Sequence, residues 1–390
     1  MGRLYTIIAW LQNDGCERVT DVKAIGFIKK NAVLCIAAMA AVITACIVPP
    51  DRQYLAYVDW RTLSCLFLTL AVVCALRNIK FFTILARRLV VMAGNMRSLF
   101  LLLITITFLG SMIIANDMAL ITFLPLGYFA LSVIKQEKYM AYLFVLQNIS
   151  ANLGGMLTPF GNPQNLYIYS FFNIQTGEFC RIMLPAFLLA VALLAVACLP
   201  IKPLRFAITE DFPDRLDGKK TALYCALFLV SILIVFRVVP YGIGLIVIPA
   251  ILLLVDRESL LMVDYGLLGT FFFFFIFAGN VARMDVVNSV MSALLERDTL
   301  LVSVLSCQFI SNVPSAILLS RFTNDYPALL LGVNIGGTGT LIASLASLIT
   351  YNEFRLLHPE QTKKYLGIFT AMNVAFLVIM TLAAKFFFAA

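Results

Sequence analysis

The chain has 390 residues, a formal net charge of +8 and a composition that is 62% hydrophobic and 13% charged, with a mean hydropathy of +0.95. These values exclude an ordinary soluble domain and predict an all-α polytopic membrane protein. Uncharged apolar runs long enough to cross a bilayer, which takes about 20 residues, recur along the whole sequence.

Five regions follow one another along the chain. Residues 1–30 are interrupted by charges and are predicted to be a cytoplasmic or interfacial segment. A first apolar region at 31–200 is followed by a polar linker at 201–220, which we expect in the cytoplasm. A connecting span at 221–237 then leads to a second apolar region at 238–390.

The stretch 98–134 in the first apolar region contains a single charged residue, Asp117. One helix of this length would measure about 55 Å, far more than the ~30 Å hydrocarbon core of a bilayer. Two full spans and a turn would need about 40 residues or more. We therefore expect a re-entrant hairpin with Asn116 and Asp117 at its tip.

The next segment, 139–171, is predicted to be a broken helix. It contains Gly154-Gly155 among amide side chains, and its prolines prevent a continuous helix. A half-helix that ends near Asn152 presents carbonyl groups, which suit cations, and one that starts near Asn162 presents N–H groups, which suit anions. The alternative role of such glycines is helix packing in the membrane.

The second apolar region repeats these features in the same order. Asn152-Leu-Gly-Gly-Met-Leu-Thr158 returns as Asn334-Ile-Gly-Gly-Thr-Gly-Thr340, and Ala115-Asn-Asp117 matches Ser311-Asn-Val313. We predict a second hairpin at 299–323, with a plain span over 299–320 as the alternative, and a second broken helix at 326–350. An odd number of crossings separates the copies, so they are predicted to be inverted repeats.

The basic residues indicate the orientation. With residues 1–30 in the cytoplasm and alternating spans, 21 of the 29 basic residues fall inside. This positive-inside bias predicts a multi-pass protein of the cytoplasmic membrane with its N-terminus inside and its C-terminus outside. We therefore expect the apolar surface of the protein to contact the lipid bilayer, and we do not expect a nucleic-acid partner.

Asp117 is the only acidic side chain deep in the apolar part of the sequence. A carboxylate at the bilayer centre costs about 2.5–3.5 kcal/mol on insertion scales, so we expect it to have a function. It caps a helix, together with Asn116, or binds Na⁺ or H⁺, with Asn116 and Asn152 as further Na⁺ ligands, and the two roles can coexist. The candidate substrate- and ion-binding residues are Asn116, Asp117, Asn152, Gly154, Gly155, Thr158, Asn162, Asn165, Ser311, Asn312, Asn334, Gly336, Gly337, Thr338 and Thr340.

Catalysis has little support in the sequence. His358 is the only histidine, and it falls in a predicted loop. The chain contains no metalloprotease, hydrolase or nucleotide-loop motif, and its nine cysteines include no Cys-x-x-Cys pair. We expect neither an enzyme nor a bound cofactor.

The motifs at Asn116–Leu120, Asn152–Asn165, Ser311–Ala316 and Asn334–Ser344 resemble those of the ion transporter superfamily, which includes arsenite permeases, D-type Na⁺/H⁺ antiporters, citrate transporters and dicarboxylate/sodium symporters. The resemblance extends over nearly all of 30–388. It implies a scaffold domain, a transport domain with two re-entrant hairpins, an elevator mechanism and a homodimer. It also implies substrate and ion sites at the hairpin tips and broken helices.

One difference from the dicarboxylate symporters of the superfamily limits the substrate classes that we expect. Dicarboxylate symporters carry Ser-Asn-Thr at both tips, whereas Asp117 and Val313 replace the threonine here. We therefore expect an ion-coupled secondary carrier of small anions or oxyanions, of the citrate-like or arsenite class. The alternatives are a Na⁺/H⁺ antiporter with Asp117 as the cation site, a channel, and, least supported, a membrane enzyme.

Overall fold

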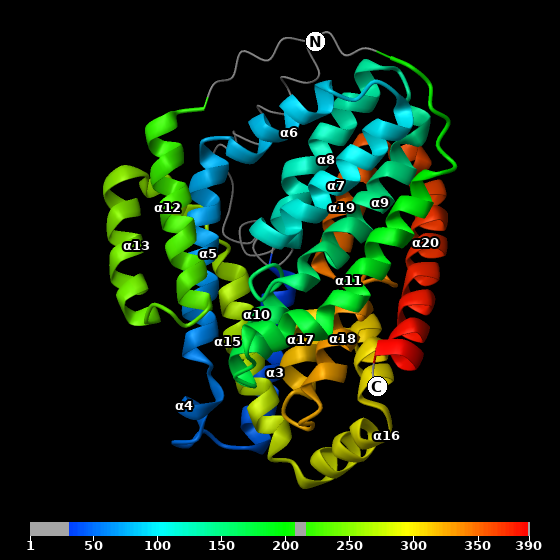
Figure 1. Cartoon of the computed structure of the whole chain (residues 1–390). Coiled ribbons are helices and arrows are strands. Elements are labelled where there is room, and N and C mark those ends of the chain that lie inside the picture. Colours follow the sequence, from blue (N-terminus) through cyan, green and yellow to red (C-terminus); the bar gives the residue numbers. More distant parts are fainter. Residues whose placement is uncertain (1–30, 207–215, 389–390) are drawn as a thin grey trace, which may run out of the picture.

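The computed structural model describes residues 31–206 and 216–388, and these residues are almost entirely helical (Figure 1). The predicted segment 1–30 and residues 207–215 of the predicted linker lie outside the described residues. Within the described residues, seven helical stretches are long and apolar enough to cross a membrane. They are α5 (Trp60–Asn78), α7 (Met96–Ile114), α8 (Asn116–Val133), α11 (Thr176–Cys198), α12 (Gly218–Val235), α15 (Tyr265–Ala282) and a stretch at 359–386 that contains α20 (Thr362–Ala383).

α16 (Asp285–Ile310) has 26 residues but is kinked, and the other helices in the described residues are shorter than these seven. Three of them are apolar: α3 (Ala32–Ile47), α13 (Tyr241–Val255) and α18 (Tyr326–Gly336). Short helices connect the longer ones: α4 (Tyr54–Tyr57), α6 (Phe81–Val91), η1 (Glu137–Tyr139) and α14 (Arg257–Leu261). η3 (Pro359–Gln361) precedes α20, and η4 (Ala384–Phe388) follows it. α6 carries the adjacent Arg87 and Arg88 in an otherwise mostly apolar sequence, as is typical of a helix that lies along a membrane interface.

The two predicted hairpins have one-residue turns. Ala115 connects α7 to α8 with φ 67° and ψ 155°, and Ser311 connects α16 (Asp285–Ile310) to α17 (Asn312–Leu319) with φ 73° and ψ 160°. α7 and α8 have 19 and 18 residues, so each is as long as a span. Length alone therefore does not exclude two spans at 98–134, because one residue makes the turn. α16 is kinked at Asp298, which separates its first part from the arm that leads to Ser311.

Both predicted broken helices are interrupted at their glycine pairs. α9 (Met140–Gly154) ends in the short helix η2 (Gly155–Leu157), and α10 (Pro163–Phe171) follows after an irregular stretch. α18 ends at Gly336, and α19 (Leu345–Leu357) begins eight residues after Gly337. Asn162 and Ser344 are the N-cap residues of the second halves. These breaks place backbone polar groups inside the protein.

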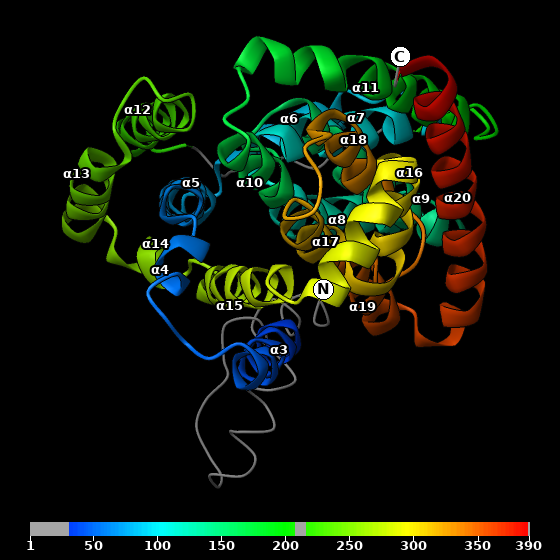
Figure 2. The same ribbon diagram turned by 90° about the horizontal axis from the view of Figure 1, so that it is seen from below.

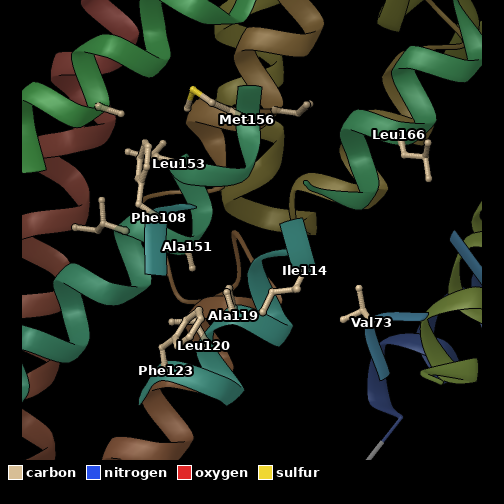
Figure 3. Packing of buried hydrophobic residues seen from close by; sticks show 14 of the residues in the cluster. Val73, Phe108, Ile114, Ala119, Leu120, Phe123, Ala151, Leu153, Met156 and Leu166 are labelled. Carbon is tan, nitrogen blue, oxygen red and sulfur yellow. The ribbon is translucent and has the colours of Figure 1, made fainter. Parts of the chain in front are cut away.

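The helices form two groups, which the view in Figure 2 separates. In one group α5 packs against α12, α13 and α14, and α3 packs along α15. In the other group α9 lies against α7, α8, α19 and α20, while α18 packs on α16 and α17. Contacts of α10 with α5 and of α15 with α17 join the groups. Figure 3 shows this junction from close by, with Val73 of α5 across from Ile114 and Leu166.

Candidate substrate and ion site

Four helix ends from the two halves of the chain meet in a network of buried amides. Asn334 on α18 donates to Asn165 Oδ1 (2.6 Å) and accepts from Asn162 Nδ2 (3.3 Å). On the other side, Asn152 Oδ1 accepts from Ser344 Oγ at 2.7 Å and from Asn116 Nδ2 at 3.2 Å. These side chains are all buried. The first hairpin tip and both breaks are therefore linked by direct side-chain hydrogen bonds.

One amide side chain satisfies the free carbonyl groups of each break. Asn165 Nδ2 lies 3.1 Å from Gly155 O and 3.3 Å from Met156 O. In the second break Gln308 Nε2 donates to Gly336 O at 2.9 Å, and Gln308 Oε1 accepts from Thr340 N at 2.9 Å. Lipid cannot supply these partners at membrane depth, so the amides allow the helices to be interrupted there.

The two hairpins meet their breaks through equivalent bonds. Thr158 Oγ1 donates to Met112 O at 2.9 Å, and Thr340 Oγ1 donates to Gln308 O at 3.0 Å. At the tips, Asn116 Oδ1 accepts from the backbone N–H of Asp117, and Asn312 Oδ1 accepts from that of Val313. The second tip also contacts its break, since Asn312 N and Ser311 Oγ both donate to Ala343 O.

The glycines predicted to belong to the site also allow close packing of the helices. A Cβ atom on Gly154 would collide with the Phe108 carbonyl and the Ser111 hydroxyl on α7, and one on Gly336 would lie 2.8 Å from Cys307 Sγ on α16. Gly155 and Gly337 instead face the side chains of Asn162 and Asn312. The first glycine of each pair therefore seats the broken helix on its hairpin, and the second lets an amide approach the break.

Asp117 does not join the amide network. Its side chain lines a cavity of about 40 Å³, together with Thr69 of α5, Pro163 of α10 and Asp264, which caps α15. About 10–15 Å³ holds one water, so the cavity has room for a few waters or one small cation. The Oδ1 atom of Asp117 is buried and has no hydrogen-bond partner. In the first turn of α8 the side chain of Asn116, and not that of Asp117, accepts a hydrogen bond from a free backbone N–H, so helix capping does not account for this carboxylate.

Several residues of the site were not in the predicted set. Gln308 bonds the second break, Ser344 belongs to the amide network, and Asp264 lines the cavity of Asp117. Ser344 lies 182 positions after Asn162, the spacing of the two glycine pairs, and that spacing was the available signal. Predicted Thr338 is buried, but its hydroxyl bonds only the local Ile335 carbonyl. Within residues 31–206 and 216–388, no group of three His, Cys, Asp or Glu residues could hold a metal ion.

Apolar helices of spanning length that surround a buried polar site define a multi-pass membrane transporter, and comparisons with known proteins agree with this class. A family model described as "Citrate transporter" matches residues 19–323. The chain therefore belongs to the citrate transporter family.

Three relatives show how far the similarity extends. An uncharacterized transporter of Methanocaldococcus jannaschii is 30% identical over 85% of this chain and 90% of its own length. The inner membrane protein YbiR of Escherichia coli is 29% identical over 76% of this chain and 81% of its own length. The silicon efflux transporter LSI3 of Oryza sativa subsp. japonica is 32% identical, but over 45% of this chain and 38% of its own length.

Proposed function

We propose that the protein is an ion-coupled secondary active transporter of small anions or oxyanions, located in the cytoplasmic membrane. The observation that carries this proposal is the unpartnered Asp117 carboxylate beside the amide network. A buried carboxylate without a partner is costly and binds a proton or a cation readily. Asp117 would hold the coupling ion, Na⁺ or H⁺, while the amides and hydroxyls hold the cargo.

The proposed mechanism has two inverted repeats with re-entrant hairpins, one group of helices moving as an elevator against the other. Equivalent backbone angles at Ala115 and Ser311 support this reading, as do the equivalent threonine bonds of the two breaks. The cavity at Asp117 lies between α8 and α5, which belong to different groups. Ion binding there would therefore control how the groups move. By resemblance to the superfamily, we propose a homodimer.

The proposed cargo follows from the chemistry of the site and from the relatives. Asn152 Nδ2 and Asn162 Oδ1 are buried without hydrogen-bond partners, so the network keeps both donor and acceptor capacity. Such a lining suits a small polyoxygenated solute. The match to the citrate transporter family supports a carboxylate as cargo, and the rice relative, which is named a silicon efflux transporter, supports a small oxygen-rich solute. One charge moved through 100 mV is worth about 2.3 kcal/mol, so one coupled ion is sufficient to drive accumulation or extrusion.

The test is gradient-driven flux in liposomes containing Asp117→Asn. We expect the Asp117→Asn protein to fold. It should no longer take up citrate or arsenite in response to a sodium or proton gradient, because the amide side chain cannot bind the coupling ion. Asp285→Asn is the matched control, since Asp285 also lies in the first turn of a helix but is exposed. Wild-type coupled flux in Asp117→Asn would refute the assignment.

A Na⁺/H⁺ antiporter is the second candidate. The observation that favours it is the presence of Asp264 in the same cavity as Asp117, because two carboxylates suit a transported cation. In that case sodium-dependent proton movement would occur in liposomes without any organic or oxyanion solute. Dependence of that movement on added citrate or arsenite would exclude the antiporter.

A further inference from the structure

A second polar cavity lies away from the amide network, where α10 and α17 end. Its volume is about 570 Å³, and its lining includes Arg321, Glu296 and the loop residues Thr323 and Asn324. This volume is in the range of small-molecule sites, which is about 300–1,000 Å³. None of the lining residues belongs to the amide network or to the cavity of Asp117.

Arg321 is the main charged group of this cavity. Its guanidinium donates from Nη2 to Tyr57 O at 2.8 Å and lies 5.0 Å from the centre of the Phe171 ring. The Nε–H is buried and has no hydrogen-bond partner. A guanidinium has five N–H donors in a rigid fork that matches carboxylate and oxyanion groups, and a buried donor without an acceptor is costly. Arg321 is therefore held in place with donor capacity unused.

No carboxylate forms an ion pair with Arg321 in the described part of the chain. The ion pairs there join Arg283 to Asp51, His358 to Glu360 and Lys385 to Asp298. Arg283, at the end of α15, lies 2.9 Å from the Asp51 carboxylate. Its hydrogen bond lowers the pKa of Asp51 below the usual value, which is the effect of an arginine on a carboxylate that it pairs with. Glu296 lines the cavity of Arg321 but is exposed, so solvent screens its charge.

We propose that this cavity is a second anion-binding site, which takes small carboxylate or oxyanion ligands on Arg321. The inference rests on the proposed function in taking the transported anion class as the ligand. The exposed Asn324, which also lines the cavity, offers a further amide donor at its rim. Ser320 connects the cavity to the centre of the protein, because its hydroxyl lies 2.7 Å from the Tyr167 hydroxyl on α10, the helix that carries Asn165. The site would collect or release the anion at one face of the protein.

Arg237 provides a matched control for Arg321. Its Nη2 donates to Tyr169 O at 2.8 Å, its guanidinium lies 4.7 Å from the Tyr169 ring centre, and its Nε is buried and unpartnered. The two arginines thus make the same kinds of contact, but Arg237 does not line this cavity. A role in structure alone predicts similar effects for both substitutions, whereas an anion site predicts an effect of Arg321 only.

The experiment is calorimetric titration of the purified, detergent-solubilised protein with citrate. We expect Arg321→Gln to weaken one citrate-binding step by about tenfold or more, because hydrogen bonds to charged groups are lost. Arg237→Gln should leave that step within twofold. Arg321→Gln should weaken citrate binding by the same factor when the protein also carries Asp117→Asn. A loss that persists in that background comes from the Arg321 cavity and not from the central site, so failure of the two sites can be distinguished. Identical titrations of wild type and Arg321→Gln, or no citrate binding by either, would overturn the proposal.

Glu296→Gln gives an independent test that does not depend on how well Arg321→Gln folds. Glu296 is exposed, so its removal should not affect folding, but it removes a negative charge that repels the anion. We expect citrate affinity to increase about two- to fivefold, the usual scale for an exposed charge, and the gain to shrink in high salt. Unchanged or weaker citrate binding by Glu296→Gln would contradict an anion site.

Discussion

Asn334 is the residue that most directly joins the two halves of the chain. It donates to Asn165 Oδ1 and to its own helix at Leu330 O, and it accepts from Asn162. A buried amide with three partners fixes its neighbours as well as itself, since each partner would otherwise be unsatisfied. The sequence could identify Asn334 as a site residue through the duplicated motif. It could not identify its partners, which lie 169 and 172 positions away.

Asn334→Ala should therefore destabilise the protein by about 1–3 kcal/mol, because it leaves buried polar atoms of Asn165 and Asn162 without partners. Asn352→Ala is the control: Asn352 is exposed within α19, and its loss should change stability by less than about 0.5 kcal/mol. The measurement is chemical unfolding of the detergent-solubilised variants. Equal stability of the two variants would show that the amide network does not hold the halves together.

The breaks and turns of the helices differ in how far the sequence could predict them. The Gly-Gly pairs signal the interruptions after α9 and α18, because glycine weakens a helix, and Pro159 and Pro163 are a further signal after α9 only. The turns at Ala115 and Ser311 carry no such signal, since both residues have positive φ where glycine is usual. Gln308 was also unpredictable as the partner of the second break, because its role depends on where α16 passes α18. Local chemistry thus predicted the breaks, and the length of the apolar run placed the first tip within one residue of Ala115, whereas tertiary packing set the exact turn residues and the partners.

Gly154→Ala tests whether the first glycine of the motif seats α9 on α7. The added Cβ would collide with the Phe108 carbonyl and the Ser111 hydroxyl, and overpacking of this kind costs about 1–3 kcal/mol. We expect a lower unfolding temperature and less monodisperse protein in size-exclusion chromatography. Gly177→Ala, where nothing lies within 4 Å of the new atom, should behave like wild type. A fully stable Gly154→Ala variant would mean that the close approach of α7 and α9 is not required.

At the scale of the whole molecule, charge and the helix arrangement together suggest how the protein lies in the membrane. α4 and α16 lie at one end of the helix bundle in Figure 1, and α6 lies at the other. The loop before α20 follows α19, which packs against α8. Under the positive-inside orientation α6 and this loop are cytoplasmic, while α4 and the cavity of Arg321 face outward. The site proposed at Arg321 would then sample anions outside the cell.

Labelling with a membrane-impermeant maleimide tests this orientation in intact cells. In a cysteine-free background, a cysteine at the exposed position Gln53, next to α4, should react without permeabilisation. A cysteine at the exposed position Lys363, at the start of α20, should react only after the membrane is opened. Most native cysteines lie within helices and contribute to packing, so their removal could disturb the fold. The cysteine-free protein must therefore be shown to retain coupled flux. The reverse labelling pattern would place the Arg321 cavity in the cytoplasm, so that it would meet anions from inside the cell.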